Sequence, residues 1–359
     1  MGQPIHRRAM LAGMLATAAA TSLGGTFAAE SEANLRALAD TKGIGFGSAV
    51  DGSMLKDPAY KARLVADCNT IVPRNALKWS ATERAPGKFG FGEADAILNF
   101  AERSSMAARG HTLVWHNLPK WVTRISDAVK LEAAMVQHIE AVAGRYAGRI
   151  DSWDVVNEPL EYDDPALRAS TFLKLIGEDY IARAFQAARA ADPDAQLVLN
   201  ETHLCKAGDN YAARRTLMLE LIGRLQDRSV PIDAVGFQGH FRPGFDSLDR
   251  DGFGSFCREL RARGLKVVIT ELDASCRFTT RVEGFRETDY APPFRDMIEV
   301  AASEGDLTAV VVWGLSSRGM KPSEPDGPNK DCKVRVNLYD ADDRPLPTRA
   351  AVAEALQSL

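Results

Sequence analysis

The stretch Val267-Val268-Ile269-Thr270-Glu271-Leu272-Asp273 joins an almost unbroken apolar run to two carboxylates. A strand that is apolar on both faces is typical of a parallel sheet covered by helices on each side. Because side chains alternate along a strand, Glu271 and Asp273 are expected on the same face. The stretch therefore predicts a buried parallel strand whose carboxyl end carries acidic groups.

Seven similar β-rich runs accompany this strand, and amphipathic segments separate them. The eight runs cover 43–50, 70–75, 108–116, 150–158, 195–201, 234–240, 266–274 and 307–315, and helices are predicted at 131–146, 179–191, 211–226, 255–264, 292–303 and 348–359. Strands that each precede a helix predict an α/β fold, a (β/α)8 TIM barrel in a single domain.

A doubly wound open sheet is the competing architecture. It would require a Gly-rich nucleotide-binding turn with the G-x-G-x-x-G spacing after the first strand. Gly43, Gly45 and Gly47 lack that spacing and lie inside the first predicted strand. They indicate close packing in a barrel rather than a dinucleotide site.

Composition and charge exclude several functional classes. The chain has 359 residues, 45% hydrophobic and 26% charged, which is the balance of a globular protein. Its formal net charge is -4, with no basic stripe for nucleic acid and no polybasic run for anionic lipid. We expect neither a nucleic-acid partner nor a membrane partner for the mature protein.

The first 28 residues or so have the pattern of a signal peptide, which leaves residues 29–359 for the barrel domain. Arg7 and Arg8 precede an uncharged run from Leu11 to Gly25, and Thr26-Phe27-Ala28 provides small residues for cleavage. The paired arginines are typical of twin-arginine export, while an ordinary Sec signal is the alternative. We expect an exported protein, periplasmic or secreted.

Five cysteines occur without any C-x-x-C pair, so the sequence predicts no zinc site. Cys68 and Cys257 lie in apolar helical patterns and are expected to be buried free thiols. Cys276 and Cys332 follow the last two predicted strands, and we expect them to pair after export. No metal and no cofactor are predicted.

Polar side chains gather where the predicted strands end, which in an α/β barrel is the end that carries the chemistry. They are Arg74, Asn75, His111, His116, Asn157, Glu158, Asn200, Glu201, Gln238, His240, Glu271 and Asp273.

A second stretch, Trp153-Asp154-Val155-Val156-Asn157-Glu158-Pro159, ends in a glutamate on the fourth strand, across the barrel from Glu271 on the seventh. Two facing carboxylates are what glycoside hydrolysis needs, since one donates a proton and the other attacks the anomeric carbon. A separation of about 5–5.5 Å favours retention through a covalent intermediate. The competing interpretation is that each glutamate only forms a salt bridge at its strand end.

The segments Asp154–Pro159 and Ile269–Asp273 resemble the acid/base and nucleophile signatures of family 10 glycoside hydrolases, mostly endo-β-1,4-xylanases. The resemblance runs from about Gly45 to Leu346. Further matches occur in order at Asn75-x-x-Lys78-Trp79, at 111–116, at 236–240 and at Val312-Trp313-Gly314. Six short motifs in sequence on eight strands are far more specific than any one of them.

The resemblance implies Glu158 as acid/base and Glu271 as nucleophile. It implies that Asn157 binds the 2-hydroxyl of the cleaved sugar, and that His240 contacts Glu271 and is oriented by Asp273. It further implies sugar-hydroxyl contacts for Asn75, Lys78, His111 and Gln238, and flat faces for pyranose rings at Trp115 and Trp313.

Three departures from the family pattern concern the sugar-binding walls. Arg74 stands where the family usually has a glutamate, and 317–321 lacks the usual second tryptophan but contains Lys321. His116 is followed by Asn117-Leu118-Pro119 without the usual glutamine. None of these changes affects the two glutamates.

The leading hypothesis is therefore a retaining endo-β-1,4-xylanase that hydrolyses internal bonds of a polysaccharide by double displacement. Arg74 motivates a same-class alternative, a β-glycanase acting on another and acidic glycan. A non-catalytic carbohydrate-binding barrel is the alternative from a different class. The sequence leaves the oligomeric state open.

Overall fold

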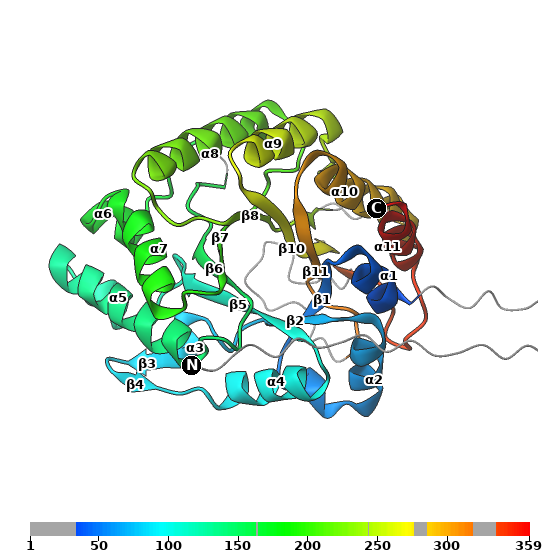
Figure 1. Ribbon diagram of the computed structural model, residues 1–359, viewed down its shortest axis with the longest axis horizontal. Coiled ribbons are helices and arrows are strands. Elements are labelled where there is room, and N and C mark those ends of the chain that lie inside the picture. Colours follow the sequence, from blue (N-terminus) through cyan, green and yellow to red (C-terminus); the bar gives the residue numbers. More distant parts are fainter. Residues whose placement is uncertain (1–33, 163, 243, 276–285, 319–334) are drawn as a thin grey trace, which may run out of the picture. The chain divides into compact units, whose positions relative to one another are not determined.

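The computed structural model describes residues 34–359 except 163, 243, 276–285 and 319–334. Eight parallel strands form a closed barrel in the order β11-β1-β2-β5-β6-β7-β8-β10, and β10 pairs with β11 to close it (Figure 1). These strands are β1 (Gly45–Val50), β2 (Thr70–Pro73), β5 (Ala107–Val114), β6 (Ser152–Asn157), β7 (Gln196–Glu201), β8 (Ala234–Phe237), β10 (Lys266–Ser275) and β11 (Leu307–Val312). The predicted (β/α)8 barrel is confirmed.

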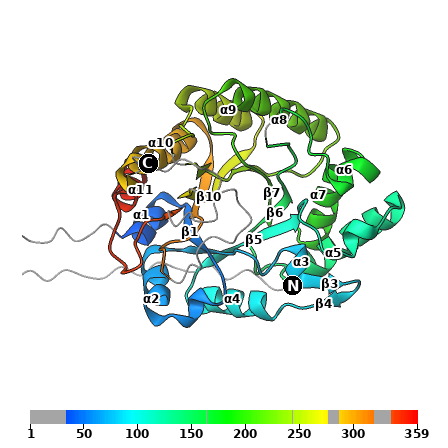
Figure 2. The same cartoon turned by 180° about the vertical axis from the view of Figure 1, so that it is seen from behind.

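Helices surround the strands as an outer ring, which is visible from both sides (Figures 1 and 2). One helix follows each barrel strand: α2 (Pro58–Asp67), α4 (Gly92–Arg103), α5 (Ala128–Arg145), α7 (Asp179–Ala191), α8 (Asp209–Asp227), α9 (Arg250–Ala262), α10 (Ala291–Glu304) and α11 (Pro347–Ser358). The additional helix α1 (Leu35–Lys42) precedes β1 and packs beside α11.

Short elements complete the connections between strands and helices. They are α3 (Trp79–Thr82), α6 (Thr171–Leu175), the antiparallel hairpin β3 (Glu83–Ala85) and β4 (Lys88–Phe89), the short strands β9 (His240–Phe241) and β12 (Arg335–Val336), and 3-10 turns at Met54–Lys56, Val122–Arg124 and Glu287–Tyr290. Strand β9 continues the β8 segment and pairs with the end of β10, which aligns His240 with Asp273.

The glycines of β1 allow close contact with β2. A Cβ atom on Gly47 would lie 2.3 Å from the carbonyl oxygen of Thr70, and one on Gly45 would lie 2.8 Å from the Thr70 hydroxyl. No side chain fits in that space without moving the neighbouring strand. The prediction of close barrel packing is confirmed for Gly45 and Gly47. It is wrong for Gly43, which lies before β1 and ends α1 in a left-handed conformation with φ of 67°.

The predicted strands run one to three residues too far at several carboxyl ends. Strand β2 ends at Pro73, β5 at Val114 and β6 at Asn157, so Asn75, His116 and Glu158 follow their strands. Predicted helix boundaries agree within two residues except at two amino ends. Helix α9 begins five residues early, and α5 begins three residues early because the Asp127 carboxylate accepts a hydrogen bond from the Lys130 amide at 2.8 Å. The side chains that follow the strands are therefore placed by loops.

Three cysteines of the described segments, Cys68, Cys205 and Cys257, are free and buried, which confirms the prediction for Cys68 and Cys257. The predicted pairing of Cys276 with Cys332 and the predicted signal peptide lie outside the described residues. Among the helices between residues 34 and 359 that the structure describes, none has the length and apolarity to span a bilayer.

Candidate active site

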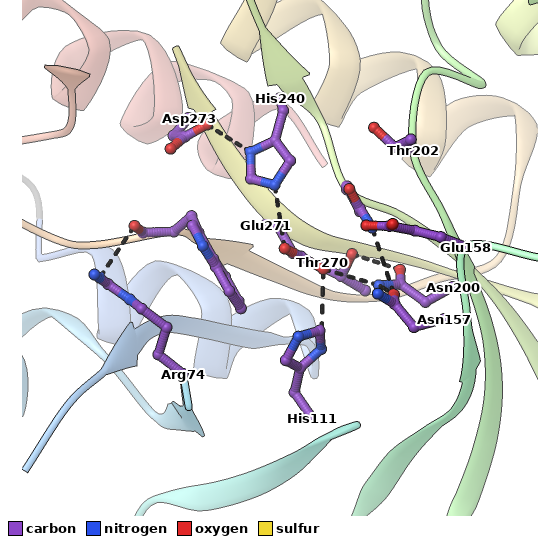
Figure 3. Close-up of polar contacts among 12 residues, drawn as sticks. Arg74, His111, Asn157, Glu158, Asn200, Thr202, His240, Thr270, Glu271 and Asp273 are labelled. Atoms are coloured by element: carbon purple, nitrogen blue, oxygen red, sulfur yellow. Dashed lines mark hydrogen bonds and ion pairs between the residues drawn. The ribbon is translucent and has the colours of Figure 1, made fainter. Parts of the chain in front are cut away.

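The carboxylate of Glu271 lies on β10, and the strand alternation brings Asp273 to the same face. His240 bridges the two acids: its Nδ1 is 2.6 Å from Asp273 Oδ1, and its Nε2 is 3.1 Å from Glu271 Oε2 (Figure 3). A neutral imidazole can donate from only one of its nitrogens, whereas the imidazolium donates from both. Two acceptors on opposite nitrogens therefore favour the charged ring.

Burial of the ring opposes a positive charge, but Asp273 and Glu271 outweigh it and raise the pKa of His240 to about 10. His240 is thus an imidazolium across the acidic and neutral range. Glu271, the candidate nucleophile, therefore receives a charge-assisted hydrogen bond from the His240 ring. This geometry matches the relation predicted among the three residues.

A chain of side-chain amides holds the other oxygen of Glu271. Asn200 at the end of β7 donates through Nδ2 to Glu271 Oε1 at 2.9 Å and to Asn157 Oδ1 at 2.7 Å. Its own carbonyl oxygen accepts from the Thr270 hydroxyl at 2.8 Å, so the amide orientation is fixed. The sequence placed Asn200 in the polar cluster but gave it no role, and the structure shows that it connects Glu271 to Asn157 (Figure 3).

Glu158 is the first residue after β6, and it adopts a left-handed backbone conformation with φ of 56°. Its amide still donates to the Asn200 carbonyl at 2.9 Å, which ties the residue to β7. A positive φ is uncommon for a residue with a side chain and occurs where surrounding contacts fix the backbone. Here Arg168 Nε supplies such a contact, donating to the Glu158 carbonyl at 2.8 Å.

Three neutral donors surround the Glu158 carboxylate. Gln238 Nε2 donates to Oε1 at 2.9 Å, while Oε2 accepts from Trp115 Nε1 at 3.0 Å and from the Tyr162 hydroxyl at 2.6 Å. Burial alone would raise the pKa of Glu158, but the hydrogen bonds from Tyr162, Gln238 and Trp115 outweigh it and lower the pKa. Trp115 is therefore a ligand of the glutamate as well as a candidate surface for a sugar ring.

The two glutamates share one network at the carboxyl ends of the strands. Gln238 Nε2, which holds Glu158, is also 3.4 Å from Asn157 Oδ1, and Asn157 leads through Asn200 to Glu271. Both glutamates are nearly buried, with 8% of Glu158 and 4% of Glu271 exposed. Two carboxylates so enclosed are costly unless they are hydrogen-bonded, and each is bound by at least two donors.

His111 closes the network from β5. Its Nδ1 is 2.9 Å from Asp154 Oδ2 and 3.9 Å from Glu271 Oε1. Asp154 also accepts from Arg109 at 2.6 Å, so a buried ion pair orients the His111 ring. The ring of Trp313 meets His111 edge to face, with 5.2 Å between centroids. His111 and Trp313 therefore lie next to the predicted nucleophile.

Lys78 and Asn75 form a polar group on the loop after β2. Lys78 Nζ donates to Asn75 Oδ1 at 3.0 Å and lies 4.9 Å from the centre of the Trp115 ring. Burial lowers the pKa of Lys78, although Glu271 and Glu158 act in the opposite direction. Asn75 is exposed and donates to Asp51 at 3.0 Å, which leaves both residues able to meet a sugar hydroxyl.

Arg74 does not stand free to meet an acidic sugar. Its guanidinium is 3.6 Å from Asp51, donates to the carbonyl oxygens of Trp313 at 3.2 Å and Ala49 at 3.4 Å, and packs near the Trp313 ring. Only 12% of the side chain is exposed. Lys321, the other cation of the altered wall, lies outside the described residues.

All eleven predicted site residues thus lie in one connected region, together with four contributors to which the sequence assigned no role. Asn200, Tyr162 and Arg168 contact Glu158, Asn157 or Glu271 directly, and His116 Nδ1 lies 3.6 Å from Glu158 Oε2. Asn200 carried a signal, since it ends a strand, whereas Tyr162 lies in a loop that no periodicity describes. No group of three or more metal-ligating side chains occurs in the described part of the chain.

Several known proteins are similar to this chain in sequence. The sequence profile of Glycosyl hydrolase family 10 matches residues 34–355. Endo-1,4-beta-xylanase A of Phanerodontia chrysosporium is 38% identical over 300 residues, 81% of this chain and 70% of that protein. Endo-1,4-beta-xylanase 3 of Hypocrea jecorina is 33% identical over 87% of this chain and 82% of its own length.

Solved structures of xylanases are similar to this chain in fold. Xylanase 10B from Thermotoga maritima superposes with a TM-score of 0.81 at 28% identity, covering 91% of this chain and 98% of that one. Xylanase 10B from Thermotoga petrophila RKU-1, solved in complex with xylobiose, gives the same score, identity and coverage.

Proposed function

The chain belongs to glycosyl hydrolase family 10, a family of retaining endo-xylanases, and we propose that Glu158 and Glu271 are its acid/base and its nucleophile. The observation that carries the proposal is the difference between the two carboxylate environments. Glu271 is hydrogen-bonded to the His240 imidazolium, whereas every side chain that hydrogen-bonds Glu158 is neutral and its cationic neighbour, the Arg168 guanidinium, lies 3.8 Å from Oε2. The enzyme hydrolyses internal β-1,4 bonds of xylan.

In the first step Glu271 attacks the anomeric carbon while Glu158 gives its proton to the leaving oxygen. The glycosidic C–O bond breaks as the bond to Glu271 forms, and the leaving sugar departs with the Glu158 proton. Bound substrate excludes water from both acids, and the like charge of Glu271 then favours the protonated form of Glu158.

In the second step Glu158 takes a proton from water, and the hydroxide attacks the same carbon and releases Glu271. Asn157 supports both steps by binding the sugar 2-hydroxyl, a contact that strengthens as positive charge develops on the ring. Asn200 donates a hydrogen bond to the side-chain carbonyl oxygen of Asn157, so the amide hydrogens of Asn157 point away from Asn200. Sugar rings and hydroxyls are bound by Asn75, Lys78, His111, Trp115, Gln238 and Trp313.

A panel of purified β-glycans, scored for new reducing ends, tests the substrate. We expect the highest kcat/KM on β-1,4-xylan, with internal cleavage seen as an early fall in viscosity. Glu271→Gln serves as the control that removes enzymatic release. A clear preference for a uronic-acid polymer would favour the acidic-glycan alternative, and no release from any glycan would favour a binding protein. The contacts made by Arg74 within the wall argue against the acidic glycan.

Export is the other part of the proposal. Arg7, Arg8 and the uncharged run from Leu11 to Gly25 support removal of about the first 28 residues by the twin-arginine route. N-terminal sequencing of the recovered enzyme should begin near residue 29. Replacing both arginines with lysine should hold the precursor inside the cell. Unchanged export of that variant would favour the Sec route, and an intact Met1 on exported protein would end the idea.

A further inference from the structure

Tyr162 is the one phenol in the described residues that donates to either glutamate. Its hydroxyl is 2.6 Å from Glu158 Oε2, the same oxygen that accepts from Trp115 Nε1. The Arg168 guanidinium lies over the Tyr162 ring at 4.0 Å and is itself fixed by the Glu158 carbonyl. The centroids of the His116 and His203 rings lie 6.2 and 6.0 Å from that of the Tyr162 ring. These contacts hold the phenol against the carboxylate although 38% of the residue is exposed.

The two oxygens of Glu158 are consequently not equivalent. Oε2 accepts two hydrogen bonds, and one of its donors is an indole N–H, which has no capacity to accept. A proton placed on Oε2 would therefore face the Trp115 hydrogen. Oε1 accepts only from Gln238 among the described residues, and it keeps a lone pair for a proton.

We propose that Tyr162 is a positioning residue that fixes Oε2 of Glu158 and leaves Oε1 to exchange the proton with the leaving sugar and with water. This inference rests on the proposed role of Glu158 as acid/base. Tyr162 acts through Glu158 and does not itself transfer a proton. In the first step the proton passes from Oε1 to the departing oxygen, and in the second step Oε1 receives a proton from the attacking water.

The Tyr162 hydroxyl stabilises the ionised form of Glu158, so its removal should raise the pKa of Glu158. The phenol donates to the carboxylate and lowers the pKa of Glu158, acting with Gln238 and Trp115 against burial. Without that donor the carboxyl should bind its proton more tightly, and the acid form should survive to higher pH. The basic limb of the kcat/KM profile, which reports loss of the acid proton, should move upward.

Other ionisable groups around Glu158 and Tyr162 remain unchanged in such a variant. His116 and Arg168 approach Glu158 Oε2 within 4 Å, and the further neighbours are Lys78, Glu161, Glu201, His203 and Glu271. Burial raises the pKa of Glu201 to about 7, so this group titrates in the same range. Because Glu201 is present in every variant compared, a difference between profiles reports the phenol hydroxyl.

The experiment compares pH profiles of kcat/KM on xylo-oligosaccharides for wild type, Tyr162→Phe and Tyr211→Phe. Tyr211 is the matched control, since its ring neighbours His203 at 5.4 Å and its hydroxyl accepts from Arg242 rather than contacting Glu158. We expect Tyr162→Phe to move the basic limb up by about 0.5–1 pH unit. This is the effect of losing one hydrogen bond to a charged group when water partly replaces it. Tyr211→Phe should leave the limb in place.

A Glu158→Gln arm separates the inference from the role on which it rests. If the residual activity of Glu158→Gln keeps the wild-type basic limb, the limb belongs to another group and the acid/base assignment fails. If Glu158→Gln abolishes the limb but Tyr162→Phe leaves it unmoved, the inference about Tyr162 alone is overturned. An equal shift in Tyr211→Phe would also overturn it, because a general effect of losing a hydroxyl would then be sufficient.

Discussion

The ends of β10 and β6 hold chemically identical carboxylates in contrasting ways. Glu271 lies within a strand and is fixed by the Asn200 amide and the His240 imidazolium. Glu158 follows its strand with φ of 56°. Its three hydrogen-bond donors are neutral and all lie outside the strands, and the Arg168 guanidinium is 3.8 Å from Oε2. A hydrogen bond from a cation suits a group that must stay ionised, and hydrogen bonds from neutral donors suit a group that must gain and lose a proton. The different proposed roles of the two glutamates thus follow from the side chains around them.

The largest effect is expected when the β10 carboxylate is removed. Glu271→Gln keeps the shape and the hydrogen-bond capacity of the side chain but has no nucleophilic oxygen. We expect kcat to fall about 10⁵-fold or more, comparable with the loss of a nucleophile in other hydrolases. Glu220→Gln, an exposed position on α8, is the control and should retain full activity. Added azide should not restore a β-configured product, and restoration would place the nucleophile elsewhere.

Removal of the β6 carboxylate should cost less, and the cost should depend on the substrate. Glu158→Ala is expected to lower kcat/KM on xylan about 10²–10⁴-fold, the usual contribution of general acid catalysis. An aryl xyloside with a good leaving group needs little protonation, so its first step should be much less impaired. Azide can then attack the intermediate in place of activated water and give a β-azide. A loss that is equal for all leaving groups would contradict the assignment.

Sequence patterns predicted the strands and both glutamates because these lie where apolar periodicity ends in a polar group. They did not predict Tyr162 and Arg168, which reach Glu158 from a loop whose path depends on tertiary contacts. The polar cluster contained Asn200, but its role depends on the partners of its amide, which only the packing of β6, β7 and β10 defines. Arg74 shows the opposite case: the sequence suggested a ligand for acidic sugars, and the structure places its guanidinium 3.6 Å from Asp51.

The cation beside Glu271 should also be measurable as pH-dependent stability. The pKa of His240 is raised from 6.5 to about 10 in the folded protein, so the ring binds its proton more tightly when folded. That stabilisation is complete below about pH 6.5 and is lost as the pH rises through about 10. His240→Asn should lower the unfolding free energy by about 2 kcal/mol at pH 6.

Denaturant titrations of wild type and His240→Asn at pH 6, 8 and 10.5 measure this difference. The difference in unfolding free energy between the two proteins should decrease steadily from pH 6 to pH 10.5. A gap that is constant across the range would mean that the ring is neutral in the folded protein, and the comparison between the two carboxylates would lose its electrostatic basis.

The smallest effect on activity is expected from a substitution at Arg74, which follows β2. Its guanidinium is already paired with Asp51 and with main-chain carbonyls, so little of its charge is available to substrate. Arg74→Gln should change the ratio of kcat/KM between uronic-acid-bearing and neutral xylo-oligosaccharides by less than about twofold, since a screened ion of this kind contributes well under 1 kcal/mol. A tenfold fall in that ratio would restore the acidic-glycan alternative.

Covalent trapping tests the contrast between the two carboxylates most directly. A 2-deoxy-2-fluoro xylobioside with a good leaving group slows the second step and lets the glycosyl-enzyme accumulate. Intact mass spectrometry should show one added disaccharide, and fragmentation of the labelled peptide should assign it to Glu271, with Glu158→Ala still able to form the adduct. A label on Glu158, or complete turnover with no covalent species, would contradict the account.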